Sequence, residues 1–377
     1  MTEATAPHPA GQDGIKLSVR GLSKRYGPTV ALHPTDLDLR TGEFMTLLGP
    51  SGSGKTTLLM MVAGLLNSNS GDLWIDGKRT TNSPPWERGI GMVFQNYALF
   101  PHMSVFENVA FPLRMRKVPE DAIRREVAEV LDMVQLGHTA QRLPRGLSGG
   151  QQQRIALARA FVFKPHLILM DEPLGALDKK LRDQLQLEIK NIHLTHDTTI
   201  LYVTHDQGEA LTMSDRICLM NNGRIEQLDT PSALYFRPKT VFAADFLGDS
   251  NFIDGVVRKA AGEHVGIEAE VARGAVLRGV GDALPAGSRA RMMVRPERLS
   301  LASEVPEGWN ALPVTVRQSI FVGSFTRHFV TGPAGLDLVS LELTAGPGSE
   351  RAAGQQLMAI WPPESAVVLA DDREDAS

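Results

Sequence analysis

The chain has 377 residues, 42% of them apolar and 22% charged, with a formal net charge of −4. This composition is ordinary for a folded globular protein, and the length allows two domains. The slightly negative net charge excludes a global electrostatic attraction to nucleic acid. A local basic patch on the surface remains compatible with this net charge.

The sequence also bears on the cellular compartment. No stretch approaches 18 uncharged apolar residues, so we expect no segment that crosses a membrane. The first residues lack a basic region followed by an apolar core, which predicts a cytoplasmic protein. The single cysteine, Cys218, lies in an apolar run and is predicted to be a buried, inert thiol.

The first part of the chain has the pattern of an α/β domain. Residues 1–14 are rich in Pro, Gly and Ala without periodicity, which predicts a disordered tail. Short apolar runs then alternate with helical patterns over 15–245. We expect strands at Phe44–Leu48, Leu167–Met170 and Ile200–Val203, a helix at Thr56–Leu66, a mostly helical subdomain at about 97–160, and a hairpin turn at Asn222 and Gly223.

The character of the sequence changes after about residue 250. Short β-prone segments alternate with Gly- and Pro-rich turns, which predicts a small all-β domain of barrel type over 246–370 and an acidic tail over 371–377. Clustered arginines in this domain could recognise a small anion, but a solvated β surface is the simpler interpretation. These arginines are Arg295, Arg298, Arg317 and Arg327.

A glycine-rich loop follows the first of the expected buried strands and opens a helix, which is the context of a phosphate loop. Its backbone amides would surround the phosphates of a nucleotide, and the helix N-terminus would add positive potential. Lys55 would bridge the β- and γ-phosphates, and the Thr56 hydroxyl would ligate Mg²⁺. The loop comprises Gly49, Pro50, Ser51, Gly52, Ser53, Gly54, Lys55, Thr56 and Thr57.

Two adjacent carboxylates, Asp171 and Glu172, follow the second expected strand. Asp171 could bind Mg²⁺ directly or through water, while Glu172 could act as general base on the attacking water. Such a pair taken alone more often begins a helix or turn, so its weight here comes from its place after a phosphate loop.

Three further residues carry weaker signals. His205 ends the third expected strand and is either structural or a donor to the γ-phosphate. Gln95 is suited to contact Mg²⁺ and the attacking water, and Tyr26 is either a core aromatic or a platform for a purine ring.

A second glycine-rich stretch, 147–154, contains Ser148, Gly149, Gly150 and Gln151. It lies too far along the chain to extend the phosphate loop. If both sets of amides contact one nucleotide, they could come from two copies of the protein.

Taken in order, these motifs over about 15–240 resemble those of ATP-binding cassette proteins, and the chain is similar to the ATPase subunit of an importer. The resemblance implies an α/β phosphate-loop ATPase cassette with an inserted helical subdomain. It also implies that Tyr26 stacks on adenine, that Gln95 and Thr56 hold Mg²⁺, and that His205 contacts the γ-phosphate. Residues 148–151 would contact the ATP of the opposite subunit, and the segment Gly175–Asp178 would cross the dimer seam. One common form of that segment begins with Ser instead of Gly175.

The resemblance further implies the partners and the cofactors, ATP and Mg²⁺. The chain would form a head-to-tail homodimer at the cytoplasmic face of the inner membrane. ATP hydrolysis in this dimer would drive two transmembrane permease subunits. A solute-binding protein would be an indirect partner. Part of the aromatic segment Phe94–Phe106 would receive the permease, although ordinary core packing is the competing interpretation.

The C-terminal domain is similar to the oligonucleotide-binding-like β-barrel of importers for polyamines, ferric iron, sulfate and sugars. The resembling stretches are Phe246–Phe252, Val294–Glu297 and Trp361–Glu364. The segment Asn108–Lys117 favours the spermidine/putrescine branch, and the barrel is expected to be regulatory. A cassette ATPase acting on nucleic acid or ribosomes is the distant alternative, but its usual long coiled coil or second cassette is absent from this sequence.

Overall fold

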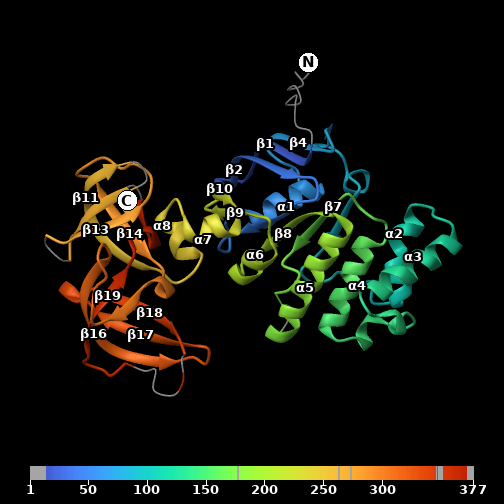
Figure 1. Cartoon of the computed structure of the whole chain (residues 1–377). Coiled ribbons are helices and arrows are strands. Elements are labelled where there is room, and N and C mark those ends of the chain that lie inside the picture. The colour runs from blue at the N-terminus through green and yellow to red at the C-terminus, as the bar shows by residue number, and fades with distance from the viewer. Residues whose placement is uncertain are drawn as a thin grey trace, which may run out of the picture. The chain divides into compact units, whose positions relative to one another are not determined.

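The computed structural model describes residues 14–175, 178–261, 264–271, 274–344, 346 and 351–371. The tails expected at 1–14 and 371–377 therefore lie almost entirely outside the described residues. The chain divides into two compact units, Met1–Pro231 and Ser232–Ser377 (Figure 1).

The first unit contains two sheets. An antiparallel sheet has the strand order β2-β1-β4-β5. Its strands are β1 Ile15–Tyr26, β2 Thr29–Arg40, β4 Ser70–Ile75 and β5 Lys78–Arg79. The second sheet has the order β10-β9-β3-β8-β7-β6. Its strands are β3 Phe44–Leu48, β6 Ile90–Val93, β7 Leu167–Asp171, β8 Thr199–Thr204, β9 Arg216–Asn221 and β10 Arg224–Asp229.

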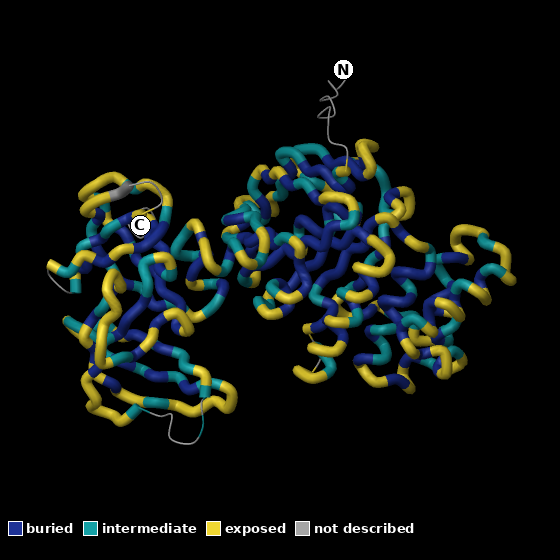
Figure 2. The backbone as a smooth tube through the Cα atoms, viewed as in Figure 1, coloured by how far each residue is buried: buried dark blue, intermediate teal, exposed yellow. Residues whose placement is uncertain are grey.

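Strands β3, β7 and β8 are buried at every position, as expected of parallel strands covered on both faces. Figure 2 shows this buried centre in dark blue. Only β10 runs antiparallel to its neighbour, because a tight turn at Asn222 and Gly223, both with positive φ, returns the chain from β9. Cys218 is buried in β9, and burial raises the pKa of its thiol to about 12, as its apolar context predicted.

Helices make up most of the segment between β6 and β7, as predicted. The helices of the first unit are α1 Lys55–Ala63, α2 Val105–Met115, α3 Glu120–Met133, α4 Gly149–Phe161, α5 Lys179–His196 and α6 Gln207–Met213. The helix expected to reach Leu66 ends at Ala63, because Gly64 adopts a left-handed conformation and its amide returns to the last turn. No helix within the described ranges is long and apolar enough to span a bilayer.

The second unit begins with two short helices, α7 Pro231–Phe236 and α8 Val241–Phe246, the first of which starts at the unit boundary. A closed barrel follows with the order β11-β12-β13-β20-β14. Its strands are β11 Asn251–Ala261, β12 His264–Ala269, β13 Val276–Val280, β14 Arg289–Val294 and β20 Ala366–Ala370.

A second sheet accompanies the barrel, which the sequence did not predict. Its order is β15-β19-β16-β17-β18. Its strands are β15 Ser300–Ala302, β16 Asn310–Phe321, β17 Phe325–Thr331, β18 Asp337–Leu343 and β19 Gln356–Trp361. Apolar side chains of both sheets, including the fully buried Trp361, belong to one core.

Arg295 explains why the second unit begins before the expected boundary at 245/246. Its buried guanidinium donates to the carbonyls of Tyr235, Ala244 and Gly248, which ties the two short helices to the barrel. Arg295 is therefore neither part of a solvated surface nor available to an anion, in contrast to both sequence interpretations. Arg298 and Arg317 are exposed, and Arg327 forms an ion pair with Asp249.

Candidate functional site

The phosphate loop connects β3 to α1, and glycine is required within it. Gly54 has φ of 96°, and a Cβ there would lie 2.7 Å from the carbonyl oxygen of Ala31. Ser51 is exposed and Ser53 is buried, with its amide donating to the Pro50 carbonyl. Because α1 begins at Lys55, the first amides of the helix border the loop, an arrangement that favours binding of an anion.

Lys55 lies inside this loop. Its ammonium donates to the carbonyl oxygens of Gly49 and Pro50 at 2.8 and 2.9 Å. Burial lowers the pKa of Lys55, and the charges of Glu172 and Asp171 oppose that shift. The loop thus holds a cation beside its own amides, which suits it to a polyanion.

The beginning of α1 also contacts the end of β7. The Thr56 hydroxyl donates to Oδ1 of Asp171 at 3.1 Å. Burial raises the pKa of Asp171, and the hydrogen bond from Thr56 acts in the opposite direction. Thr57, the next residue of α1, is partly buried.

Glu172 is the centre of a polar cluster at the carboxyl ends of neighbouring strands. One carboxylate oxygen accepts a hydrogen bond from Gln95 Nε2 at 3.3 Å, and the other lies 3.3 Å from Nδ1 of His205. Glu172 has a positive φ of 44°, an uncommon conformation for a side-chain-bearing residue. Because β6, β7 and β8 are parallel neighbours, Gln95, Glu172 and His205 meet at one point although they are far apart in the sequence.

The ABC transporter family matches residues 32–175, and the TOBE domain family matches residues 292–369. A spermidine/putrescine import ATP-binding protein of Acidothermus cellulolyticus is 44% identical over 97% of this chain and 95% of its own length. The protein with the same description from Thermobifida fusca is 45% identical over 94% and 93% of the two lengths. The chain belongs to the ATP-binding proteins of ABC transporters.

Solved structures of ABC cassettes share the fold. A dimeric bacterial ABC transporter cassette is 33% identical, with a TM-score of 0.53 over 57% of this chain and 98% of that chain. A dimeric post-hydrolysis state of an ATP-binding cassette bound to ADP and Pi is 32% identical, with the same TM-score and coverage. The predicted cassette fold and the predicted C-terminal β-barrel domain are both confirmed.

The second glycine-rich stretch begins α4 of this ABC protein. Ser148 caps the helix by accepting from the Gln151 amide, and the Gln151 side chain accepts from the Ser148 amide. Gly149 is exposed, whereas a Cβ on Gly150 would lie 2.4 Å from Leu181 of α5. Within the described residues, the hydrogen bonds of Ser148 and Gln151 stay at this helix start and do not reach the phosphate loop.

Asp178 caps α5 by accepting a hydrogen bond from the Leu181 amide at 3.0 Å. It is exposed, as is Gly175, while residues 176 and 177 of the same motif lie outside the described residues. Tyr26 is 53% exposed, with the Lys24 ammonium 5.3 Å from its ring centre. This exposure excludes a core role for Tyr26 and leaves its ring face available for stacking.

The site's oxygen donors fit a magnesium ion. Mg²⁺ prefers hydroxyl, carbonyl and carboxylate oxygens, completed by phosphate and water. Thr56 and Asp171 lie in contact, and Gln95, whose Nε2 donates to Glu172, has an amide oxygen of the type that Mg²⁺ prefers. Among the described residues there is no cluster of three His, Cys, Asp or Glu side chains that could hold a metal ion.

Sequence reasoning missed the residues that support the His205 loop. Glu209 on α6 is buried, and its Oε2 accepts from the hydroxyls of Tyr202 and Thr204, each at 2.7 Å. Asp206 caps the same helix through the Glu209 amide. The spacing of Asp206 and Glu209 is that of a helix-capping pair, which is the signal that could have found them.

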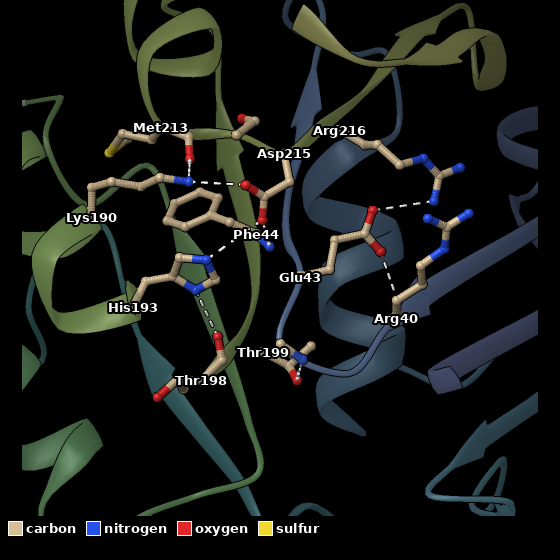
Figure 3. Close-up of polar contacts among 12 residues, drawn as sticks. Arg40, Glu43, Phe44, Lys190, His193, Thr198, Thr199, Met213, Asp215 and Arg216 are labelled. Atoms are coloured by element: carbon tan, nitrogen blue, oxygen red, sulfur yellow. Dashed lines mark hydrogen bonds and ion pairs between the residues drawn. The ribbon is translucent and has the colours of Figure 1, made fainter. Parts of the chain in front are cut away.

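A second polar network lies at the opposite end of β3 (Figure 3). The Asp215 carboxylate accepts hydrogen bonds from the Phe44 amide at 2.8 Å and from Lys190 at 3.0 Å, and lies 3.5 Å from His193 Nε2. Burial alone would raise the pKa of Asp215, but the hydrogen bonds from His193, Phe44 and Lys190 together lower it. This network connects α5 to the strand that carries the phosphate loop.

Proposed function

We propose that this chain is the ATP-hydrolysing subunit of a membrane importer whose cargo is a polyamine, spermidine or putrescine. The observation that carries the ATPase assignment is the approach of Gln95 and His205 to the two carboxylate oxygens of Glu172, beside the phosphate loop. A general base held by two polar partners next to a phosphate-binding loop is suited to activating water for attack on a phosphate.

In this reaction the water oxygen attacks the γ-phosphorus of ATP, and the bond from that phosphorus to the β–γ bridging oxygen breaks. Glu172 takes the proton from the water, giving ADP and inorganic phosphate. Lys55 neutralises charge on the phosphates, and His205 donates to the γ-phosphate. Bound Mg²⁺, held by Thr56, Gln95 and Asp171, would add further neutralisation of phosphate charge.

The complete site is assembled from two copies of the chain. Ser148, Gly149, Gly150 and Gln151 begin a helix whose N-terminal amides can bind an anion, but their contacts lie away from the phosphate loop of the same chain. We infer that they contact the ATP held by a second copy, with Asp178 at the seam. The dimeric state of the similar cassettes supports this arrangement.

The cargo and the membrane partners are inferred from relatives. Several relatives at 41–45% identity are described as spermidine/putrescine import ATP-binding proteins. On this basis the dimer acts at the cytoplasmic face of the inner membrane on two permease subunits, which receive cargo from a solute-binding protein. Part of the segment Phe94–Phe106, which contains several exposed residues, is the proposed contact with the permease. Ferric iron, sulfate and sugar are the alternative cargoes.

The test is ATP hydrolysis by the chain reconstituted with its permease in vesicles. We expect a spermidine- or putrescine-loaded binding protein to raise ATP turnover, and binding proteins loaded with iron, sulfate or sugar to leave it unchanged. If a binding protein loaded with one of these other solutes raises ATP turnover instead, that solute is the cargo. Activation by RNA or ribosomes in the absence of the permease would support the distant alternative instead.

A further inference from the structure

We propose that Arg182 is a positioning residue that holds the His205 loop against the start of α5 and thereby keeps His205 beside Glu172. This inference deepens the proposed ATPase function and rests on it. It concerns a residue of α5, outside the phosphate loop in the sequence.

Arg182 lies in the first turn of α5, next to the proposed dimer seam. Its backbone amide donates to the Asp178 carbonyl at 2.9 Å. Its guanidinium Nη1 donates to Oδ2 of Asp206 at 3.2 Å, and its Nε lies 3.9 Å from Oε1 of Glu209. One side chain thus connects the start of α5 to the two carboxylates that follow His205.

His205 depends on its neighbours for its position. Its side chain is 59% exposed, and its Nδ1 lies 3.3 Å from Oε1 of Glu172, a contact that can orient the ring. The chain around it is held by Thr204, whose hydroxyl accepts from the Asp206 amide at 3.0 Å. Asp206 in turn uses Oδ1 to cap α6 and Oδ2 to accept from Arg182. Without Arg182, one of these two anchors of Asp206 is lost.

Arg182 also compensates a buried charge. Glu209 is almost fully buried, and burial raises its pKa, whereas the charge of Arg182 lowers it. A buried carboxylate is costly unless hydrogen bonds and a nearby cation offset its lost hydration. Removing the guanidinium would therefore weaken the contacts that Arg182 makes with both Asp206 and Glu209.

These contacts form a closed ring that includes the proposed general base, Glu172. Glu172 and Asp178 lie on the same connection between β7 and α5. Arg182 joins the start of α5 to Asp206, and His205 returns to Glu172. A shift at the start of α5, where a second copy would touch the chain, is thus transmitted to His205. Arg182 makes the position of His205 depend on the state of the dimer seam.

The experiment compares Arg182→Gln with Lys190→Gln. Both remove one positive charge from α5 that pairs with an aspartate, but Lys190 pairs with Asp215 at the far end of β3 (Figure 3). We expect Arg182→Gln to lower kcat about 10-fold or more, because small displacements of reacting groups reduce rates steeply. ATP affinity, measured by calorimetry in the Glu172→Gln background, should stay within about twofold. Lys190→Gln should keep the kcat of the unaltered chain.

Two further variants separate positioning from folding. Arg182→Lys keeps the charge with a single donor group and should recover part of the lost kcat. Asp206→Asn combined with Arg182→Gln should lose little more than Arg182→Gln alone, because both changes weaken the same Arg182–Asp206 contact. If Arg182→Gln does not fold, Arg182→Lys and Asp206→Asn carry the test through the same loss of kcat at unchanged ATP affinity.

The results that overturn the proposal are distinct from those that overturn the ATPase function. A kcat for Arg182→Gln within twofold of the unaltered chain, an equal loss in Lys190→Gln, or fully additive losses in the double variant would each exclude the positioning role. Absence of ATP turnover in the unaltered chain with its permease would instead overturn the proposed function itself.

Discussion

Glu172 and His205 approach each other across the carboxyl ends of two adjacent parallel strands, with 3.3 Å between Oε1 and Nδ1. The other oxygen of Glu172 accepts from Gln95. The carboxylate is therefore held on both sides by groups that are also suited to contact phosphate and metal. Its orientation, and not only its presence, is set by these two contacts.

Replacing Glu172 by Gln should remove the general base while keeping the shape of the side chain. We expect kcat for ATP hydrolysis to fall at least about 100-fold, within the usual range for loss of such a group. ATP binding should persist, and the variant should accumulate as an ATP-dependent dimer in size-exclusion chromatography. Normal phosphate release by Glu172→Gln would show that another group activates the water.

Asp215 should contribute to stability in a pH-dependent manner. Its pKa is lower in the folded chain than its ordinary value, so its contribution is present above the unfolded pKa of about 4 and is lost as the pH falls through the folded pKa. Asp215→Asn should lower the free energy of unfolding at pH 7 by about 1 kcal/mol. This figure is reduced because the side chain is 46% exposed and screened by water.

Urea unfolding at pH 7 and at progressively lower pH would measure the difference between Asp215→Asn and the unaltered chain. The difference should shrink as the pH falls below the unfolded pKa. The matched control is Asp337→Asn, which removes an exposed partner of the exposed Arg317 and should change stability little. A constant difference across the whole pH range would mean that the charge of Asp215 is not the cause.

Gln153 on α4 is a site where stability can be increased. It is fully buried, and neither amide atom has a hydrogen-bond partner among the described residues. An unsatisfied buried polar group costs about 1–3 kcal/mol, whereas methionine fills a similar volume without that cost. Gln153→Met should therefore raise the free energy of unfolding by about 1 kcal/mol.

The neighbouring Gln152 provides the control for this substitution. Its side chain donates to the carbonyls of Pro144 and Leu147, so Gln152→Met should lower stability or leave it unchanged. Thermal and urea unfolding of both variants would measure the contrast. Equal gains for the two substitutions would contradict the explanation based on the unsatisfied amide.

Arg295 should be essential for the stability of the second unit. Its guanidinium satisfies the carbonyls of Tyr235, Ala244 and Gly248, and Arg295→Met would leave these acceptors without their charged donor. We expect a loss of at least about 3 kcal/mol in the unfolding transition of this unit. Arg298→Met is the control, because Arg298 is exposed and should tolerate the change. Circular dichroism and limited proteolysis would detect selective unfolding of residues 232–371.

The phosphate loop, the strands that flank it and the Asp171–Glu172 pair could be predicted because their signals are contiguous in the sequence. Backbone conformation, strand burial and helix initiation are local properties, so a short run of residues carries them. Gln95, His205 and Tyr26 were weak as single residues and gained weight only from their order along the chain. The same local rules separated the α/β region from the all-β region.

Other features depend on contacts between distant residues. The Asp215 network joins residues 44, 190 and 193, Arg295 binds carbonyls some 50 positions earlier, and the second β sheet depends on strand pairing across the domain. Asp215 and Arg295 were each compatible with an ordinary exposed role, since an Arg or Asp does not encode its partner.

The sequence by itself determined that the chain has an α/β domain with a phosphate loop and a C-terminal β domain, because these properties follow from neighbouring residues. Only the tertiary structure decided that Glu172 is held between Gln95 and His205, and that Arg182 supports the loop carrying His205. The physical reason is that side-chain hydrogen bonds and ion pairs depend on distances that strand order and helix packing set.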